Sequence, residues 1–152
     1  MSRRCVILVL FGLALSGQPV AGQVTTLHNL TFGTITSGTT THVVYTGSSA
    51  AEWQIHPTLG LTGTFQFTLP TTLSSPGASL SITYSSTDGH WRANTNNPSS
   101  GGTTFDPHNT QSITLVLSQN VFVWLGASVS PPLNQKPGTY TGTVVLTVSG
   151  LL

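Results

Sequence analysis

Hydrophobic residues alternate with polar ones in short segments along most of the chain after residue 23. In residues 62–69, Phe65, Phe67 and Leu69 fall on one face and polar residues on the other, and Pro70 ends the segment. An alternation with a period of two predicts a β-strand with one buried face. The same reasoning predicts strands over residues 30–32, 39–46, 52–56, 80–84, 113–117, 121–125 and 139–148.

The segments between these strands are rich in Gly, Pro, Ser and Asn, which favour chain reversals. Strong helix formers do not recur at helical spacing after residue 23, so no helix is predicted there. About eight short strands separated by such turns are typical of an antiparallel β-sandwich or barrel. The remaining length of roughly 130 residues suits one domain with its own core. We therefore expect a single all-β domain over residues 23–152.

The N-terminal segment has a different pattern. Arg3 and Arg4 precede an apolar stretch, residues 5–15, and small residues at 21 and 22 follow it. A positive start, an apolar stretch of about eleven residues and a small-residue cleavage site together predict a secretory signal peptide. A membrane-spanning helix needs roughly twenty apolar residues. We therefore expect residues 1–22 to be removed, with no membrane insertion afterwards, and the mature protein to be secreted, periplasmic or on the cell surface.

Charged residues are few, and this excludes some functions. The chain holds four Lys and Arg against three Asp and Glu, and removal of residues 1–22 would leave Arg92 and Lys136 as its cations. Nucleic-acid binding depends on clusters of Lys or Arg that contact phosphates, so nucleic acid is not an expected partner. Low charge together with high β-propensity favours self-association. The one cysteine, Cys5, lies in the predicted signal peptide, so we expect no disulfide in the mature protein.

Residues 85–110 do not alternate and are predicted to form a long irregular loop. Loops of this length in a compact domain are usually functional or poorly ordered. Trp91, Arg92 and Asn94 lie in this segment and are the kind of side chains that contact a carbohydrate or a protein partner. They form a candidate ligand loop, and the alternative is that Trp91 only anchors the loop against the sandwich. Trp53 and Trp124 lie in apolar strand patterns and are expected in the core.

Four side chains in the same segment are candidates for metal binding or acid–base chemistry. Asp88, His90, Asp106 and His108 form two Asp-x-His pairs, and carboxylate and imidazole are metal ligands. Asp-Gly and Asp-Pro are also frequent in turns, and we favour that interpretation over a metal site. A glycoside hydrolase would need Asp88 and Asp106 on either side of a glycosidic bond. The sequence contains no nucleophile-elbow serine motif and no phosphate-binding glycine loop, so we predict neither an enzyme nor a cofactor.

Three motifs point to a family. They are LTFGTI at residues 30–35, LGA at 125–127, and NQKPGTYTG at 134–142, which a valine-rich terminal strand follows. On these motifs the chain resembles an uncharacterised family of secreted bacterial domains that is similar to spore coat protein U and to the archaic chaperone–usher pilins. The resemblance covers residues 30–148, and the Gly-x-Tyr-x-Gly element at 138–142 is its most specific part.

The resemblance implies an immunoglobulin-like antiparallel β-sandwich that is incomplete at its terminal edge strand. In the related pilins a neighbouring subunit or a chaperone donates the missing strand, which satisfies the open edge by β-augmentation. On this basis Tyr140 would lie at the mouth of an assembly groove, and Val144, Leu146 and Val148 would line it. Residues 23–29 would be the donor extension. Their alternation is weak, so a self-contained sandwich is the alternative.

These observations leave three functional hypotheses of different classes. The leading one is an exported, non-enzymatic structural or adhesive subunit of the cell surface, pilin-like, that assembles by strand donation with itself or with a periplasmic chaperone. The second is a monomeric secreted module that binds a glycan or a partner through residues 85–110. The third is a hydrolase that uses Asp88 and Asp106. The terminal strand and the low charge favour the first.

Overall fold

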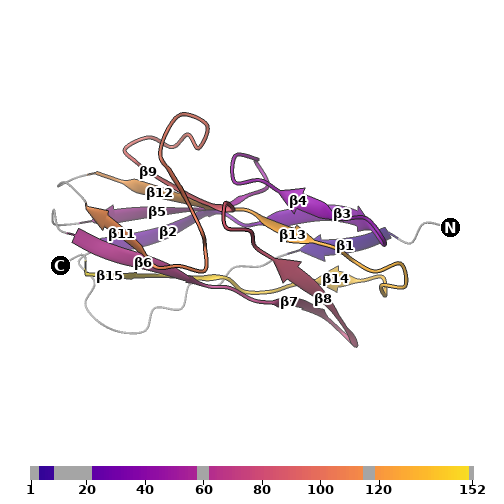
Figure 1. Cartoon of the computed structure of the whole chain (residues 1–152). Coiled ribbons are helices and arrows are strands. Elements are labelled where there is room, and N and C mark those ends of the chain that lie inside the picture. Colours follow the sequence, from indigo (N-terminus) through magenta and orange to yellow (C-terminus); the bar gives the residue numbers. More distant parts are fainter. Residues whose placement is uncertain (1–3, 9–21, 58–61, 115–118, 151–152) are drawn as a thin grey trace.

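The computed structural model describes residues 4–8, 22–57, 62–114 and 119–150, and it confirms an all-β sandwich. The strands run roughly along the long axis of an elongated molecule (Figure 1). Within the described ranges there is no helix, and so none that is long and apolar enough to cross a membrane.

One layer of the sandwich has the strand order β10-β9-β12-β5-β2, and each neighbouring pair is antiparallel. The bounds are β2 (Gly22–His28), β5 (Ala51–Pro57), β9 (Gly89–Ala93), β10 (Thr103–Phe105) and β12 (Val121–Leu125). The layer continues lengthwise through β4 (Thr41–Val43), β13 (Ala127–Val129) and β8 (Ala78–Thr83), in which β13 lies between the other two.

The second layer begins with the order β11-β6-β15, formed by β11 (Gln111–Thr114), β6 (Thr62–Thr68) and β15 (Val145–Ser149). It continues through β7 (Thr72–Ser75) and β14 (Thr139–Tyr140), which two main-chain hydrogen bonds between Ser74 and Thr141 hold together. β7 also pairs with β8 in the order β4-β13-β8-β7, so this hairpin joins the two layers. Two more strands, β1 (Arg4–Leu8) and β3 (Thr31–Thr36), extend this layer in the order β14-β1-β3.

The strand order follows the immunoglobulin arrangement. In that fold one sheet has the order A-B-E-D and the other contains C, F and G. Here β2, β5, β12 and β9 occupy the places of A, B, E and D in turn, and β6 and β15 occupy those of C and F. The place of strand G, beside the F strand, is taken by the N-terminal strand β1.

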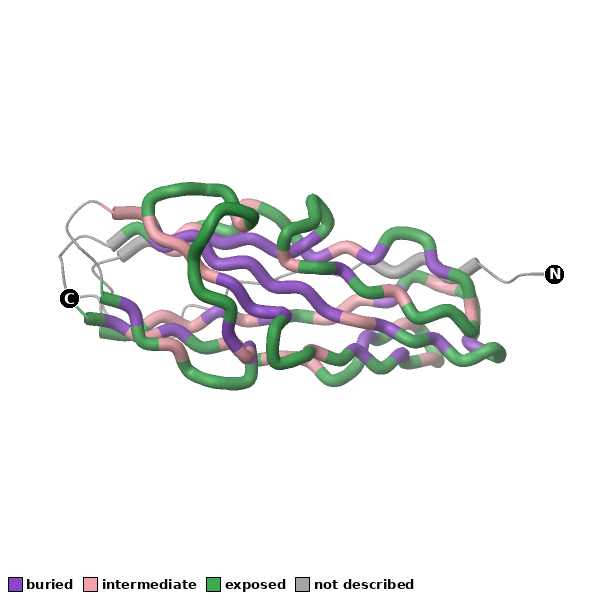
Figure 2. The backbone as a smooth tube through the Cα atoms, turned by 45° about the horizontal axis from the view of Figure 1, so that its top comes forward, coloured by how far each residue is buried: buried purple, intermediate pink, exposed green. Residues whose placement is uncertain are grey.

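The main core lies between the two layers, where the buried segments of the chain face each other (Figure 2). Phe65 of β6 and Leu80 and Ile82 of β8 are buried there, as alternation predicts. Burial of each such side chain contributes roughly 1.5–3 kcal/mol to stability. All five residues of β12 are buried, because this central strand is covered on both faces.

Three sequence predictions need correction. The predicted strand over residues 139–148 is divided into β14 and β15, with residues 141–144 between them. The predicted strand at 39–46 is present only as β4, because hydrogen bonds from Gly47 N–H to the Val44 oxygen and from Ala50 N–H to the Gly47 oxygen form turns instead. The prediction of one irregular loop over residues 85–110 is wrong, since the segment contains β9 and β10, which pair with each other. Residues 115–117 of the predicted strand at 113–117 lie outside the described residues.

Candidate functional site

The Gly-x-Tyr-x-Gly element forms a hydrogen-bonded corner around Tyr140. This side chain is completely buried, and its hydroxyl donates to the main-chain oxygen of Lys136 at 2.6 Å. The same hydroxyl accepts a hydrogen bond from Nε2 of Gln135, which also donates to the main-chain oxygen of Ser79 at 3.1 Å. A buried tyrosine at the start of strand F that bonds to the main chain just upstream is the tyrosine corner of immunoglobulin sandwiches. The corner therefore marks β14 and β15 as the F strand.

The two glycines of this element allow β14 to pack closely against β7. A Cβ atom on Gly138 would lie 2.8 Å from Oγ of Ser75. A Cβ atom on Gly142 would lie 2.7 Å from a methyl carbon of Leu73. A larger residue at either position would therefore force the Ser75 or Leu73 side chain to move.

The strand position on the other edge of β14 is occupied by β1. The two strands are parallel, with Val6 opposite Thr139 and Ile7 opposite Tyr140. On its far side β1 is antiparallel to β3, from Arg4 opposite Thr36 to Leu8 opposite Thr31. Among the described residues, β14 and β3 are connected in the sheet through β1. We call this position, between β14 and β3, the strand slot.

Part of the predicted signal peptide thus lies inside the sheet. Removal of residues 1–22 stays a prediction, and its consequence can be stated from the pairing. Without β1, the facing edges of β14 and β3 would expose main-chain groups that β1 now pairs. The buried side chains Phe32 and Ile35 of β3 and Tyr140 of β14 flank these edges. An open slot would therefore combine unpaired hydrogen-bonding groups with an apolar wall.

The predicted groove residues all lie on β14, on β15 or between them. Tyr140, Val144 and Leu146 are buried in the main core, and Val148 is partly buried against it. One edge of β15 pairs with β6, with Leu146 opposite Phe67 and Val148 opposite Phe65. Of the four residues, Tyr140 is the one paired in register with β1.

The predicted donor extension, residues 23–29, is not a free segment in this structure. Most of it belongs to β2, which pairs with β5 of the same chain. His28 Nδ1 lies 3.0 Å from Oε2 of Glu52, a buried carboxylate. The predicted donor is thus held as the edge strand of the opposite layer.

The candidate ligand loop is also placed differently. Trp91 and Arg92 lie on β9, and Asn94 follows this strand with a φ of +67°. Trp91 packs against the main core, whereas Arg92 donates to the main-chain oxygen of Asn97 at 3.3 Å and to Oγ of Ser100. Successive strand residues point to opposite faces. The structure therefore does not gather Trp91 and Arg92 on one surface, because pairing with β12 makes this segment a strand.

A cluster of aromatic side chains covers the outer face of β12. His90 stacks on Tyr45 with ring centres 4.6 Å apart, and it lies 5.8 Å from Trp124, which contacts Phe122. His90 also lies within hydrogen-bond distance of the Gly101 oxygen, 3.1 Å, and Oγ1 of Thr104, 3.2 Å. Burial lowers the pKa of His90. This cluster confirms that Trp124 is buried, although on the face away from the main core.

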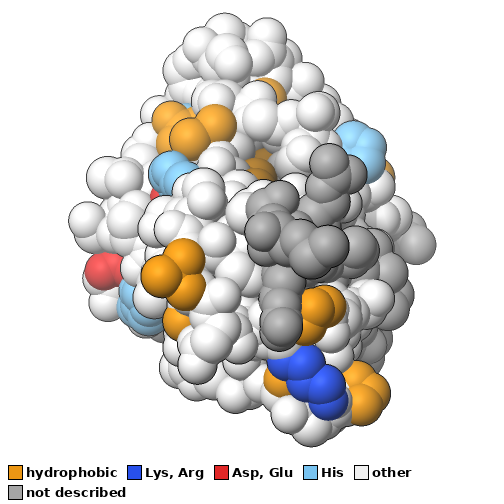
Figure 3. Space-filling view, turned by 90° about the vertical axis from the view of Figure 1, so that its right-hand side faces the viewer, with side chains coloured by type: hydrophobic (Ala, Val, Ile, Leu, Met, Phe, Trp, Pro, Cys, Tyr) orange, Lys and Arg blue, Asp and Glu red, His pale blue; other side chains and the backbone are white. Residues whose placement is uncertain are grey.

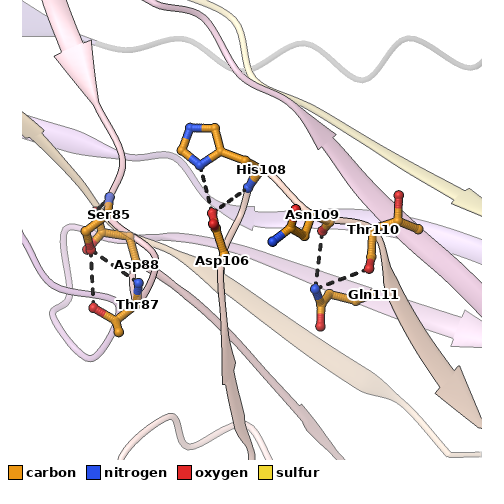
Figure 4. Close-up of polar contacts among 8 residues, drawn as sticks. All are labelled: Ser85, Thr87, Asp88, Asp106, His108, Asn109, Thr110 and Gln111. Carbon is orange, nitrogen blue, oxygen red and sulfur yellow. Dashed lines mark hydrogen bonds and ion pairs between the residues drawn. The ribbon is translucent and has the colours of Figure 1, made fainter.

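The two Asp-x-His pairs lie in separate local networks, as Figure 4 shows for their carboxylates. Buried Asp88 accepts hydrogen bonds from the Ser85 main-chain N–H at 2.7 Å and from His42 Nε2 at 2.8 Å. Asp106 accepts from the N–H of His108 at 3.0 Å and from its Nδ1 at 2.7 Å, and these bonds lower the pKa of the Asp106 carboxyl. In the described part of the chain, no three His, Cys, Asp or Glu residues are placed to hold a metal ion.

The sequence reasoning missed two partners of these buried polar groups. Gln135 stands within the NQKPGTYTG motif, five residues before Tyr140, so its place in the motif was the available signal. His42 had no such signal, because it is 46 residues away from Asp88.

No protein-family model matches this chain, and no curated protein matches it.

Proposed function

We propose that this protein is an exported, non-enzymatic structural subunit of the cell surface that accepts a β-strand from a partner. The observation that carries the proposal is the strand slot between β14 and β3, which is filled by residues of the predicted signal peptide. Once those residues are cleaved, the sandwich needs another strand at the place of strand G. A second copy of the chain or a periplasmic chaperone would supply it by β-augmentation.

The tyrosine corner supports this assignment because it fixes the F strand. The edge of an F strand in an immunoglobulin sandwich is normally covered by G. An uncovered edge beside buried apolar residues is a template for pairing with another chain. The slot is thus a position where a partner strand gains both hydrogen bonds and apolar contacts.

The end of the molecule that holds β1, β3 and β14 suits contact with a neighbouring subunit. Figure 3 looks onto this end and shows hydrophobic patches among mostly uncharged side chains. Leu133 is 83 % exposed and lies against Gly38. A hydrogen bond from the Gly38 N–H to the Pro131 oxygen joins the loop of Leu133 to the end of β3. A surface with so few charges does not repel copies of itself.

The test uses the mature chain, residues 23–152, and a synthetic peptide of residues 2–9 with Cys5→Ser. Sedimentation of the mature chain should show oligomers that grow with concentration. The peptide should enter the slot, convert oligomers to a monomeric complex and raise the melting temperature. The N-terminal sequence of the exported protein, expected to begin at Gln23, checks the cleavage on which the proposal depends.

A matched control peptide carries Val6→Asp and Ile7→Asp, because these residues pair in register with both walls of the slot. It should neither bind nor dissociate the oligomers. Successive strand residues point to opposite faces, so one of the two charges would lie against the buried side chains that flank the slot. A mature chain that is monomeric at every concentration and indifferent to both peptides would contradict strand acceptance. Retention of residues 1–22 in the exported protein would contradict it as well.

A further inference from the structure

A pocket of about 400 Å³ lies where β7 and β8 diverge toward different layers, far in sequence from the strand slot. β7 pairs with β8 from Thr72 onward, and β8 pairs with β13 through Ile82 and Thr83. The pocket is lined by Leu69, Pro70, Thr71, Ser81, Ile82, Thr83, Tyr84 and His108. No sequence motif singled it out, because its walls come from three separate segments.

The lining combines an apolar surface with groups that hydrogen-bond to hydroxyls. Leu69, Pro70 and the ring of Tyr84 supply the apolar part, and this ring meets that of His108 edge to face at 6.2 Å. Ile82 adds little surface, because it is buried in the main core. Ser81 and Thr83 supply exposed hydroxyl groups on the outer face of β8. Pockets that bind small molecules are mostly apolar with a few polar groups that fix orientation.

Two hydrogen bonds to Asp106 fix the position of the His108 ring in the pocket lining. Its Nδ1 lies 2.7 Å from Asp106 Oδ1, and an ionised carboxylate only accepts hydrogen bonds. Nδ1 therefore carries a proton, and Nε2 is available to bond a ligand hydroxyl, as an acceptor in the neutral ring and as a donor in the protonated ring. The main-chain N–H of His108 donates to the same carboxylate oxygen at 3.0 Å, so Asp106 holds both the main chain and the ring of His108.

Tyr84 contributes its ring to the pocket wall, whereas its hydroxyl lies inside the protein. Its hydroxyl is buried and has no hydrogen-bond partner among the described residues. Burial and the nearby charge of Asp88 raise the pKa of this phenol, so the group stays neutral. A buried polar group without a partner costs stability.

Among the described residues, the pocket lining contains no Lys, Arg, Asp or Glu side chain, and this restricts the class of ligand that it can bind. Arg92 bonds Asn97 and Ser100, and Lys136 bonds the Pro76 oxygen, so neither cation lines the pocket. Anionic ligands such as phosphate or sialic acid would therefore lack a counter-charge there. The geometry points to a binding site for one neutral sugar unit, whose C–H face packs on the apolar wall while its hydroxyls bond His108, Ser81 and Thr83. This site lies apart from Trp91 and Arg92.

The test uses methyl glycosides of glucose, galactose, mannose and N-acetylglucosamine as probes, with methyl sialoside and glycine-capped peptides as competitors of other classes. At least one neutral glycoside should shift the NMR signals of Tyr84 and His108, with a dissociation constant of about 1 mM. Ser81→Trp should fill the pocket and abolish these shifts. Ser79→Trp is the matched control, because it lies on the same strand, is exposed and does not line the pocket.

His108→Ala should weaken binding roughly tenfold, the effect of losing one hydrogen bond to the ligand. Ser81→Ala should weaken binding without lowering the melting temperature, because it removes only one exposed hydroxyl from the lining. This result would separate ligand contact from a structural role. Failure of all four neutral glycosides to shift Tyr84 and His108 would overturn the site. Shifts caused only by the sialoside or by the peptides, or shifts that survive in Ser81→Trp, would overturn it too.

Discussion

The Tyr140 hydroxyl donates a hydrogen bond to the main-chain oxygen of Lys136 at 2.6 Å, and so ties the start of the F strand to the loop before it. In Tyr140→Phe this oxygen and the buried Nε2 of Gln135 both lose a partner. We expect the free energy of unfolding to fall by about 1–3 kcal/mol, because two hydrogen bonds of a buried hydroxyl are lost. Urea denaturation of the mature chain measures it.

Tyr45→Phe is the control for this prediction, because the Tyr45 hydroxyl contacts Thr104 at 3.4 Å in an exposed setting. Its effect should lie within about 0.5 kcal/mol of zero. Equal losses in the two variants would mean that the corner at Tyr140 contributes no more than a surface contact.

The sequence predicted the strands whose pattern is local. Phe65 and Phe67 alternate with polar residues, and the structure places Phe65 in the core and Phe67 against it. It did not predict β9, because Gly89–Ala93 lacks alternation and becomes a strand only through its pairing with β12. The sequence did not predict the pairing of Arg4–Leu8 either, since the same apolar run is typical both of a signal peptide and of a buried strand. Contacts such as His42 with Asp88 depend on strands brought together by the whole fold.

Asp88 and Asp106 form a matched pair of aspartates that differ in burial. Both accept hydrogen bonds from a main-chain N–H and from a histidine, but Asp88 is buried, whereas Asp106 is partly accessible. We expect Asp88→Ala to lower the free energy of unfolding by about 2–3 kcal/mol, because hydrogen bonds to a buried charge are lost. Asp106→Ala should lower the free energy of unfolding clearly less, since water can bond His108 in place of the lost carboxylate. Thermal denaturation of both variants in parallel measures the difference, and a larger loss in Asp106→Ala would contradict it.

His90 makes stability depend on pH. Burial lowers the pKa of its imidazole below the ordinary value of 6.5, so the unfolded chain binds a proton that the folded chain does not. This contribution is complete above that ordinary value and is lost as the pH falls from 6.5 through the lowered pKa. We expect the free energy of unfolding to drop over this interval, and the drop to be smaller in His90→Gln.

Thr95→Gln serves as the control for this pH effect, because it changes the segment near the cluster without removing a titratable group. It should keep the full pH dependence of the native protein. Denaturant titrations at pH values on both sides of 6.5 compare the three proteins. An identical pH dependence in His90→Gln and the native protein would show that His90 does not titrate differently on folding.

The contact between His28 and Glu52 helps to hold β2 against β5 of its own chain. Oε2 of buried Glu52 lies 3.0 Å from His28 Nδ1, and its Oε1 has no partner among the described residues. His28→Ala would leave this carboxylate without its partner on the edge strand. Because the His28 side chain is 65 % exposed, we expect a loss of only about 1 kcal/mol. The amide hydrogens of β2 should exchange faster than in the native protein.

In the Glu52→Gln background, His28→Ala should have almost no effect, because no buried charge is left to lose its partner. The double-mutant cycle therefore isolates the coupling between the two residues. If the couplings are zero and exchange in β2 is unchanged, β2 is held by its pairing with β5 alone. A measured coupling would mean that strand donation by residues 23–29 must first break this contact. Donation of this segment would also have to break its pairing with β5, whatever the coupling.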